Sequence, residues 1–442
     1  MRAVFSLKGE LSQPLYALTA PILLLMQHLV VALATKALGQ TPNYDIGFWL
    51  LPLRRLAFLA DFAPWATALA LVFSLAVAWA LAVLSFQRAS RAHGGYTLAA
   101  LAIVPGVQIL SVILLALLPD RPVTPTLDQK TGVNVAHILQ GVFAGGAIIV
   151  LAVLISAVTF GTYGWGLFVA TPFLVGVITA YLANRDSALT FKQTALLVVL
   201  AAGLGTLALV MLALEGIVCI ALAAPLGALV AIAGGALGRM AALRGRNQGR
   251  PLTSIVFLPA VFFVETVVPP ALPIAMHETI DIAAQPSTVW QALTSDAPIA
   301  APPGLVAYAG LAYPIRGRVI GEGVGAERIG EFSTGLAWEQ VTAWEPDRKL
   351  AFTVLIQPPI MKEISPYRHV HAPHVSGYFE TSTTSFELQP LANGTTRLTA
   401  RAAHMLRMDP VFYWEPMARW AIHANVTRVL QDIKQKAETA PH

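Results

Sequence analysis

Residues 261–290, VFFVETVVPPALPIAMHETIDIAAQPSTVW, contain the point where one hydrophobic pattern replaces another. Up to Val268 every residue except Glu265 and Thr266 is apolar, as in a helix buried on all sides. Beyond Pro269 and Pro270, apolar and polar residues alternate from about residue 276, which is the period of a half-buried β-strand. The change predicts regions of different structure on the two sides of residue 275.

The two regions also differ in composition. Of the 442 residues, 56% are hydrophobic and 12% charged, whereas soluble domains carry about a quarter charged residues. Residues 1–275 hold 15 Lys/Arg and 8 Asp/Glu, and residues 276–442 hold 14 and 16. The contrast predicts a membrane-embedded region followed by a water-soluble domain. Because the excess positive charge belongs to the apolar region, we expect the lipid bilayer, and no nucleic acid, as a partner.

The first region contains runs that approach the roughly 20 apolar residues that a spanning helix needs. The eighth run is shorter and contains Glu265, so it either spans or lies at the interface. We therefore predict an all-α, polytopic, multi-pass bundle of seven or eight transmembrane helices, divided into segments 1–120 and 121–275. The runs are Leu15–Leu38, Phe62–Phe86, Tyr96–Leu118, His137–Phe160, Trp165–Leu182, Thr194–Leu214, Gly216–Leu237 and Leu252–Val268.

Lys and Arg in the connections predict the orientation of these helices. Connections on one side hold four Lys/Arg, and those on the other hold 11, with the largest cluster at residues 239–250. The positive-inside rule places the second set in the cytoplasm and the N-terminus outside. The side on which the C-terminal domain lies then depends on whether residues 252–268 cross the membrane.

Two stretches of the first region resemble a known but uncharacterised family. FSLKGELSQPLYAL (5–18) and FQRASRAHGGYTLAALAIVPGVQILSVILLALLP (86–119) are similar to a bacterial inner-membrane domain of unknown function. That family opens on a Gly-Arg signature, where this chain has Gly9 and Glu10. The resemblance implies a location in the bacterial inner membrane and carries no agreed activity.

The second region, residues 276–442, predicts an α+β domain. A strand at residues 277–284 precedes a short helix at 287–293, a series of strands, and a long amphipathic helix from about 410 to 437. Asn393 and Gly394 supply a tight turn between the last two strands. The long helix must cover the concave face of an antiparallel sheet to bury its apolar side, which is a helix-grip arrangement.

This pattern resembles the SRPBCC superfamily, which includes START and polyketide cyclase-like domains. The resemblance is carried by IDIAAQPSTVWQAL (280–293), GEGVGAERIGEFSTG (321–335), WEQVTAWEPDRKLAFTV (338–354), NGTTRLTARA (393–402) and the closing helix. It implies an apolar pocket between sheet and helix. A filled core is the alternative, with small alanines accommodating the helix tryptophans. The predicted ligand-binding residues are Phe352, Val354, Ile356, Phe386, Leu388, Leu398, Ala400, Ala402, His404, Trp414, Met417 and Trp420.

Polar residues near this pocket suggest little catalytic chemistry. The loop EISPYRHVHAPHVSGYFE (363–380) contains three histidines without a recognised metal-ligand spacing, so we predict no metal and no cofactor. We interpret Tyr367, Arg368, His369 and His371 as a loop that gates the pocket or as an ordinary surface loop. His404 is a possible acid or base without an evident partner. Glu339 and Glu345 are expected to face solvent, and no catalytic residue is predicted.

Three functions remain open at this stage. The first is a membrane-tethered domain that binds a lipid or another hydrophobic small molecule. The second is an enzyme of the cyclase or hydrolase type that uses the same pocket. The third is a transporter or sensor in which the soluble domain is regulatory. The sequence favours binding over catalysis, and it does not indicate an oligomeric state.

Overall fold

The computed structural model describes residues 10–52, 55, 64–92, 96–103, 107–120, 135–185, 187–212, 214–244, 258–363 and 376–440. The chain divides into two units, which meet in the sequence between Pro270 and Ala271. Each unit has its own packed interior. Unit 1 denotes the part up to Pro270, and unit 2 the part from Ala271.

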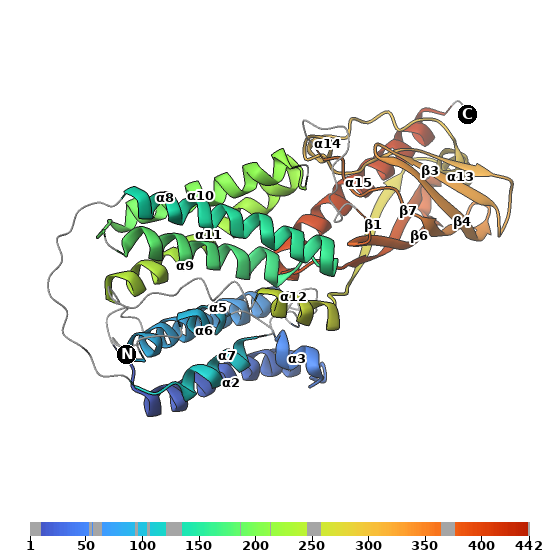
Figure 1. Cartoon of the computed structure of the whole chain (residues 1–442). Helices are drawn as coiled ribbons and strands as arrows, with labels where there is room; N and C mark the ends of the chain where they lie inside the picture. Colours follow the sequence, from blue (N-terminus) through green and yellow to red (C-terminus); the bar gives the residue numbers. More distant parts are fainter. Residues whose placement is uncertain are drawn as a thin grey trace. The chain divides into compact units, whose positions relative to one another are not determined.

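The described elements of unit 1 are helices (Figure 1). Two of them include π-helical turns: α8 continues into η1, and η2 leads into α9. The elements are α2 (Gln13–Ala37), α3 (Ile46–Leu50), α5 (Pro64–Arg91), α6 (Tyr96–Leu101), α7 (Gln108–Leu117), α8 (Val135–Val153), η1 (Leu154–Phe160), η2 (Gly166–Ala170), α9 (Thr171–Asn184), α10 (Phe191–Met211), α11 (Ile217–Arg244) and α12 (Leu258–Val267).

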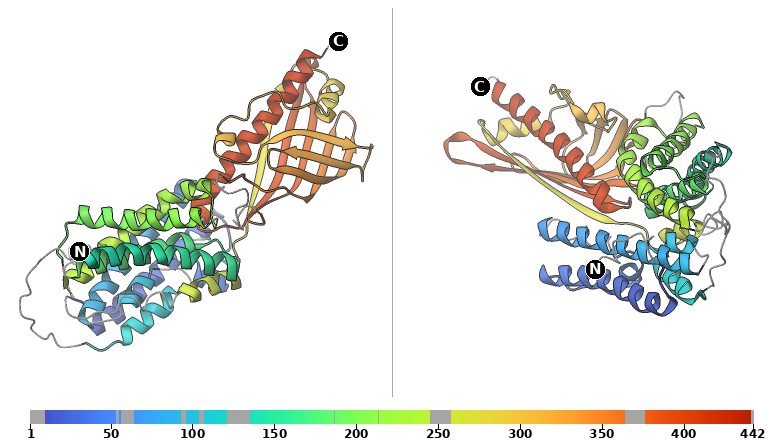
Figure 2. Two further views of the ribbon diagram at one scale, coloured as in Figure 1. Left: turned by 45° about the horizontal axis from the view of Figure 1, so that its top comes forward. Right: turned by 90° about the vertical axis from the view of Figure 1, so that its left-hand side faces the viewer.

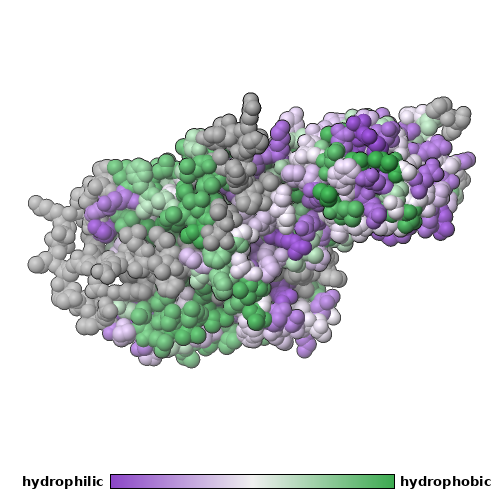
Figure 3. Space-filling model, turned by 45° about the vertical axis from the view of Figure 1, so that its right-hand side comes forward, coloured by the Kyte–Doolittle hydropathy of each residue, from purple (hydrophilic) through white to green (hydrophobic). Residues whose placement is uncertain are grey.

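Among the described residues of unit 1, six stretches of helix are long and apolar enough to cross a membrane. They are Gln13–Ala37, Val72–Arg91, His137–Ser156, Gly166–Asn184, Phe191–Met211 and Ile217–Leu243. Large apolar side chains are exposed on these helices, and on α2 they include Leu15, Leu18, Ile22, Leu25, Leu29 and Leu33. Green, hydrophobic atoms accordingly cover much of the visible surface over these helices in Figure 3. A soluble protein rarely exposes so many apolar side chains together, so the surface of unit 1 is compatible with a membrane protein.

One of the predicted spans differs from the structure. The helix predicted over residues 96–118 is two shorter helices, α6 and α7, and the sequence between them contains Pro105 and Gly106. Proline in a helix interior removes a backbone donor and clashes with the preceding turn. The run 252–268 has ten helical residues, Leu258–Val267, within its described part. The predicted number of seven or eight transmembrane helices therefore stays a prediction, since six described helices are long and apolar enough to cross a membrane.

Helices α9 and α11 pack closely because glycines lie at their contact. A Cβ atom on Gly176 of α9 would meet the carbonyl oxygen of Ala231, and one on Gly234 of α11 would meet that of Phe173. Gly238, one turn further along α11, faces the carbonyl of Val177 in the same way. Small residues spaced four apart let helix backbones approach in membranes, where van der Waals packing drives association.

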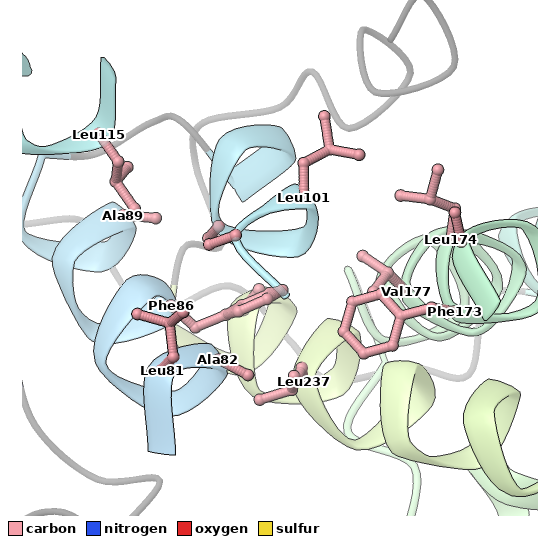
Figure 4. Close-up of a cluster of buried hydrophobic side chains, with 14 of the residues drawn as sticks. Leu81, Ala82, Phe86, Ala89, Leu101, Leu115, Phe173, Leu174, Val177 and Leu237 are labelled. Atoms are coloured by element: carbon pink, nitrogen blue, oxygen red, sulfur yellow. The ribbon is translucent and has the colours of Figure 1, made fainter. Parts of the chain in front are cut away.

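A cluster of buried apolar side chains joins several helices of unit 1 (Figure 4). Phe86 from α5, Leu101 from α6 and Phe173 from α9 all belong to it. Beside it, Arg88 is fully buried and donates hydrogen bonds to the carboxylate of Asp120 and the carbonyl of Leu118. A charge at this depth persists because it is paired, which is the usual condition for a buried ion.

Unit 2 contains a seven-stranded antiparallel sheet with the order β1-β7-β6-β5-β4-β3-β2. Strand β1 starts at Leu272, earlier than the strand predicted at residues 277–284. The strands are β1 (Leu272–Ile282), β2 (Pro314–Ile320), β3 (Glu327–Phe332), β4 (Gly335–Glu345), β5 (Lys349–Ile356), β6 (Phe379–Pro390) and β7 (Thr396–Leu406). The predicted turn at Asn393 and Gly394 is a short 3-10 helix, Ala392–Gly394, with Gly394 at φ 72°.

Three helices accompany the sheet: α13 (Pro286–Thr294), α14 (Leu305–Tyr308) and the long α15 (Val411–Thr439). Helix α15 runs along β1 and is joined to it by polar contacts at several levels (Figure 2). His423 contacts Glu278, Lys434 donates to the carbonyl of Asp281, and Glu438 accepts from the amide of Ala283. An antiparallel sheet covered on one face by a long C-terminal helix is the predicted helix-grip architecture.

Candidate functional site

The candidate site is the inner face of the unit 2 sheet, which we define as the face that α15 covers. On β7, Leu398, Ala400 and Ala402 are buried, while the residues between them are exposed or half-buried. The strand register shows which residues of β6 lie on the same face: Ala400 pairs with Phe386, and Ala402 pairs with Thr384. Alternation on β7 therefore identifies the inner face on the neighbouring strands as well.

One half of the inner face is closely packed. Five of the predicted ligand-binding residues belong to a buried cluster that includes Trp290 of α13 and Leu430 and Ile433 of α15. The five residues are Phe352, Phe386, Leu388, Leu398 and Ala400. Their side chains contribute to the core of unit 2, so the filled-core alternative describes this half of the interior.

The other predicted residues lie toward the end of the sheet where β7 leads into α15. Ala402 and Trp414 are buried there, and Val354, His404 and Met417 are half-buried. Ile356 and Trp420 are 61% and 41% exposed, so neither is enclosed by the interior. The predicted gating residues Tyr367, Arg368, His369 and His371 lie outside the described residues. This second half of the inner face is where the polar groups of the site are found.

The clearest polar feature is an ion pair between Arg328 of β3 and Glu339 of β4. Their side chains are 18% and 5% exposed, and Arg328 donates a hydrogen bond to the Glu339 carboxylate. The guanidinium carbon of Arg328 also lies 4.1 Å from the centre of the Phe352 ring, within range of a cation–π interaction. Burial raises the pKa of the Glu339 carboxyl, and the charge of Arg328 offsets part of this effect.

Glu339 corrects an expectation from the sequence. It was expected to face solvent, but it alternates with buried Ala337 and Val341 on β4 and so belongs to the inner face. Its partner could not be identified locally, because Arg328 lies on another strand and becomes adjacent only through the β3–β4 register. Charged residues in phase with apolar neighbours on two adjacent strands are the signal that could have revealed the pair.

Two glycines make room for the ion pair. Gly317 of β2 pairs with Gly330 of β3, and Gly330 pairs with Ala337 of β4, so three small residues lie side by side. A Cβ atom on Gly317 would meet the guanidinium of Arg328, and one on Gly330 would lie 3.3 Å from Oε1 of Glu339. The glycines thus allow two charged side chains to lie flat against the sheet.

His404 is the second polar feature, on β7. Its Nδ1 lies 3.0 Å from the hydroxyl oxygen of Thr381, and its ring stacks on Phe379 at 5.2 Å between centroids. Its Nε2 is buried and has no hydrogen-bond partner among the described residues. Burial lowers the pKa of His404 to about 4, so the imidazole is neutral at pH 7. A neutral histidine with one nitrogen unengaged is suited to bind a polar atom of a ligand.

Helix α15 adds a third polar group around Asn425 and Arg428. Asn425 donates from Nδ2 to the carbonyl of Ala312 at 2.9 Å. Arg428 donates to the carbonyls of Ala301 and Pro314 at 2.7 and 2.6 Å, which attaches the segment before β2 to α15. Burial lowers the pKa of the Arg428 guanidinium, and Asp432 on the next turn opposes that shift. These contacts close the interior on the side away from β1.

No cluster of three metal-ligating side chains occurs among residues that the structure describes. Glu339 is held by Arg328, and His404 and Glu339 lie on strands separated by β5 and β6. The groups on the inner face can therefore form hydrogen bonds to a bound molecule, and its walls are largely apolar. Binding sites for small molecules commonly combine these two properties.

No protein-family model matches the chain, and no curated protein matches it. The resemblance of residues 1–120 to a bacterial membrane family therefore stays a prediction. Solved structures similar to the chain include norcoclaurine synthase from Thalictrum flavum, at 10% identity over 39% of this chain and 98% of that one, with a TM-score of 0.25. An aromatase/cyclase from Streptomyces sp. R1128 is 16% identical over 38% and 94%, with a TM-score of 0.25. A conserved protein from Geobacillus kaustophilus is 13% identical over 38% and 98%, with a TM-score of 0.26.

Sheet order, the position of α15 and the two-unit division define the class of the protein. It is a helical unit, whose described part has six helices long and apolar enough to span a membrane, followed by a helix-grip unit. Unit 2 has a helix-grip fold, an antiparallel sheet that holds a long C-terminal helix against its inner face.

Proposed function

We propose that unit 2 binds a hydrophobic small molecule on the inner face of its sheet and that unit 1 anchors it in a membrane, as the bacterial inner-membrane resemblance suggests. One observation carries the proposal: the unengaged Nε2 of His404 is buried among apolar side chains, beside the small residue Ala402. A buried polar atom without a partner costs about 1–3 kcal/mol. A ligand that supplies the missing hydrogen bond and covers the apolar wall removes that cost.

Ala402 and Ala403 offer a matched test. Ala402 is buried on the inner face, whereas Ala403 is exposed on the opposite face. The purified full chain, held in detergent, should release a copurifying apolar molecule that native mass spectrometry detects. We expect Ala402→Trp to lower its occupancy about tenfold or more by filling the space, and Ala403→Trp to leave it unchanged. An empty wild-type protein, or equal occupancy in both variants, would contradict the proposal.

A cyclase- or hydrolase-type reaction in the same interior is the second candidate. Glu339 favours it, because burial raises the pKa of this carboxyl and raised carboxyl pKa values are common in general acids. The pairing with Arg328 argues against it, because a carboxylate held by a cation is a weak proton donor. Conversion of the copurifying molecule by the wild type, and its loss in Glu339→Gln, would establish an enzyme. Absence of any conversion by the wild type would exclude this reaction for that molecule.

A further inference from the structure

Three polar atoms inside unit 2 are buried without a hydrogen-bond partner among the described residues. They are Nε2 of His404 on β7, Oδ1 of Asn425 on α15 and Oγ1 of Thr334 in the turn between β3 and β4. Few buried polar atoms in folded proteins lack a partner. The chemistry of these atoms therefore indicates which group of a ligand would complete them.

Asn425 requires a donor. Its amide nitrogen donates to the carbonyl oxygen of Ala312, which can only accept. This contact decides which end of the amide is nitrogen, so the buried end without a partner is Oδ1, an acceptor. A ligand atom that completes Asn425 must carry a hydrogen, as a hydroxyl or an N–H does. A carboxylate or an ether oxygen cannot fill this role.

Ser333, the residue before Thr334, is hydrogen-bonded to the same segment of chain as Asn425. It accepts from the amide of Tyr313 at 3.2 Å and donates its own amide to the Tyr313 carbonyl at 3.0 Å. Tyr313 directly follows Ala312, to which Asn425 is bound. Residues 312–313 therefore lie between two groups with an unpaired atom: Asn425, which is bonded to Ala312, and Thr334, which follows the Ser333 bonded to Tyr313. A hydroxyl group complements such a pair, because it can donate to Asn425 and accept from Thr334.

The charged side chains that the structure describes around the inner face are already neutralised or engaged. Arg328 and Glu339 cancel each other, and burial keeps His404 neutral by lowering its pKa to about 4. Arg428 donates to two main-chain carbonyls, and Asp432 on the next turn balances its charge. A charged ligand would lose its hydration without gaining a free counter-ion among these described side chains, which disfavours its binding.

We infer that the ligand of unit 2 is a neutral amphiphile, with an apolar body and a hydroxyl group that bonds to Asn425 and Thr334. A fatty-acid carboxylate or an alkylammonium is disfavoured for lack of a counter-ion, and a pure hydrocarbon because it leaves the three polar atoms unpaired. The inference rests on the proposed function, and it adds the chemical class of the ligand.

A competition experiment on the full chain separates the ligand classes. A photoreactive twelve-carbon alcohol is crosslinked to the protein in lipid nanodiscs, and mass spectrometry maps the crosslinks to peptides of unit 2. 1-Dodecanol, dodecanoate and dodecane then compete at pH 7. We expect 1-dodecanol to compete about tenfold more strongly than dodecane, as one net hydrogen bond provides, and more strongly than dodecanoate.

Substitutions test whether the preference comes from the named atoms. Asn425→Leu removes the acceptor, and Thr334→Val is a milder change at the same segment. Both should bring 1-dodecanol and dodecane to within about threefold of each other without weakening dodecane. Gln431→Leu, on the exposed side of α15, is the matched control and should keep the tenfold preference.

The outcomes separate the two proposals. Equal competition by alcohol and hydrocarbon in the wild type would overturn the hydroxyl preference and indicate that water completes these atoms, while binding itself would stand. Stronger competition by dodecanoate would overturn it in favour of a charged ligand. Failure of the alcohol to crosslink to unit 2 at all would overturn the proposed function together with this inference.

Discussion

Arg328 on β3 donates a hydrogen bond to the carboxylate of Glu339 on β4, and its guanidinium lies over the ring of Phe352 on β5. The pair is held on the inner face by register, with Gly317 and Gly330 leaving space for both side chains. Two charges removed from water in this way are stable only together. The relationship places a polar group against the apolar core of unit 2, and it can be tested by breaking the pair.

Replacing one residue of the pair should destabilise the protein more than the pair's own contribution, because the other charge is left buried alone. We expect Glu339→Leu and Arg328→Leu each to lower the free energy of unfolding by about 3–5 kcal/mol, because one buried charge is left alone. The double variant should lose less than the sum of the two. Urea unfolding of the detergent-solubilised chain, followed by circular dichroism, measures this coupling. The exposed pair Arg397–Asp281 is the control and should show little coupling, whereas additive losses at Arg328 and Glu339 would contradict the assignment.

His404 should make stability fall in acid. The pKa of His404 is about 4 in the folded protein and 6.5 for the free side chain, so between these values the unfolded chain binds a proton that the folded chain does not. Unfolding is therefore favoured as pH falls from about 6.5 to 4, by up to about 3 kcal/mol. His404→Phe should remove this part of the pH dependence. A variant and wild type with the same slope between pH 7 and 4.5 would show that His404 is not buried as described.

Glycines of α9 and α11 should tolerate no added methyl group. In Gly176→Ala and Gly234→Ala the new Cβ would meet a carbonyl oxygen of the facing helix, so the helices must move apart. Gly203 of α10 has no atom within 4 Å of such a Cβ, and Gly203→Ala should be neutral or stabilising by up to about 1 kcal/mol through helix propensity. Thermal unfolding in detergent compares the three variants. A similar melting temperature for all of them would rule out close α9–α11 packing.

The apolar run 252–268 leads to a prediction about topology. It is short for a spanning helix, which needs about 20 apolar residues, and it contains Glu265. We therefore expect that it does not cross, and that unit 2 lies on the same side as the connection between α9 and α10. Positive-inside counting assigns that connection to the cytoplasm.

Single cysteines test this topology in a Cys219→Ala background. Ala188, between α9 and α10, and Ala392, in the turn before β7, are both exposed. A membrane-impermeant maleimide should label Ala188→Cys and Ala392→Cys only after the cells are permeabilised. Labelling of Ala392→Cys alone on intact cells would show that the chain crosses the membrane once more after α11.

Much of the architecture follows from local sequence. Apolar runs such as Phe191–Met211 have the length of a bilayer, and alternation on β7 marks a strand with one buried face. The run over 96–118 was misjudged because hydropathy alone does not register the break between α6 and α7, where Pro105 and Gly106 occur. Five of the twelve side chains predicted to line a pocket inside unit 2 belong to its buried core cluster.

The sequence by itself determined where the hydrophobic pattern changes and that unit 2 combines a sheet with a long closing helix. Both follow from hydropathy and its period, which are local properties of the chain. Only the tertiary structure decided which polar groups meet inside. Strand register places Glu339 beside Arg328, and Asn425 is hydrogen-bonded to Ala312 although 113 positions separate them in the sequence. Such contacts depend on distances in space between segments that no local pattern relates. For that reason the chemistry of the candidate site emerges from the folded chain.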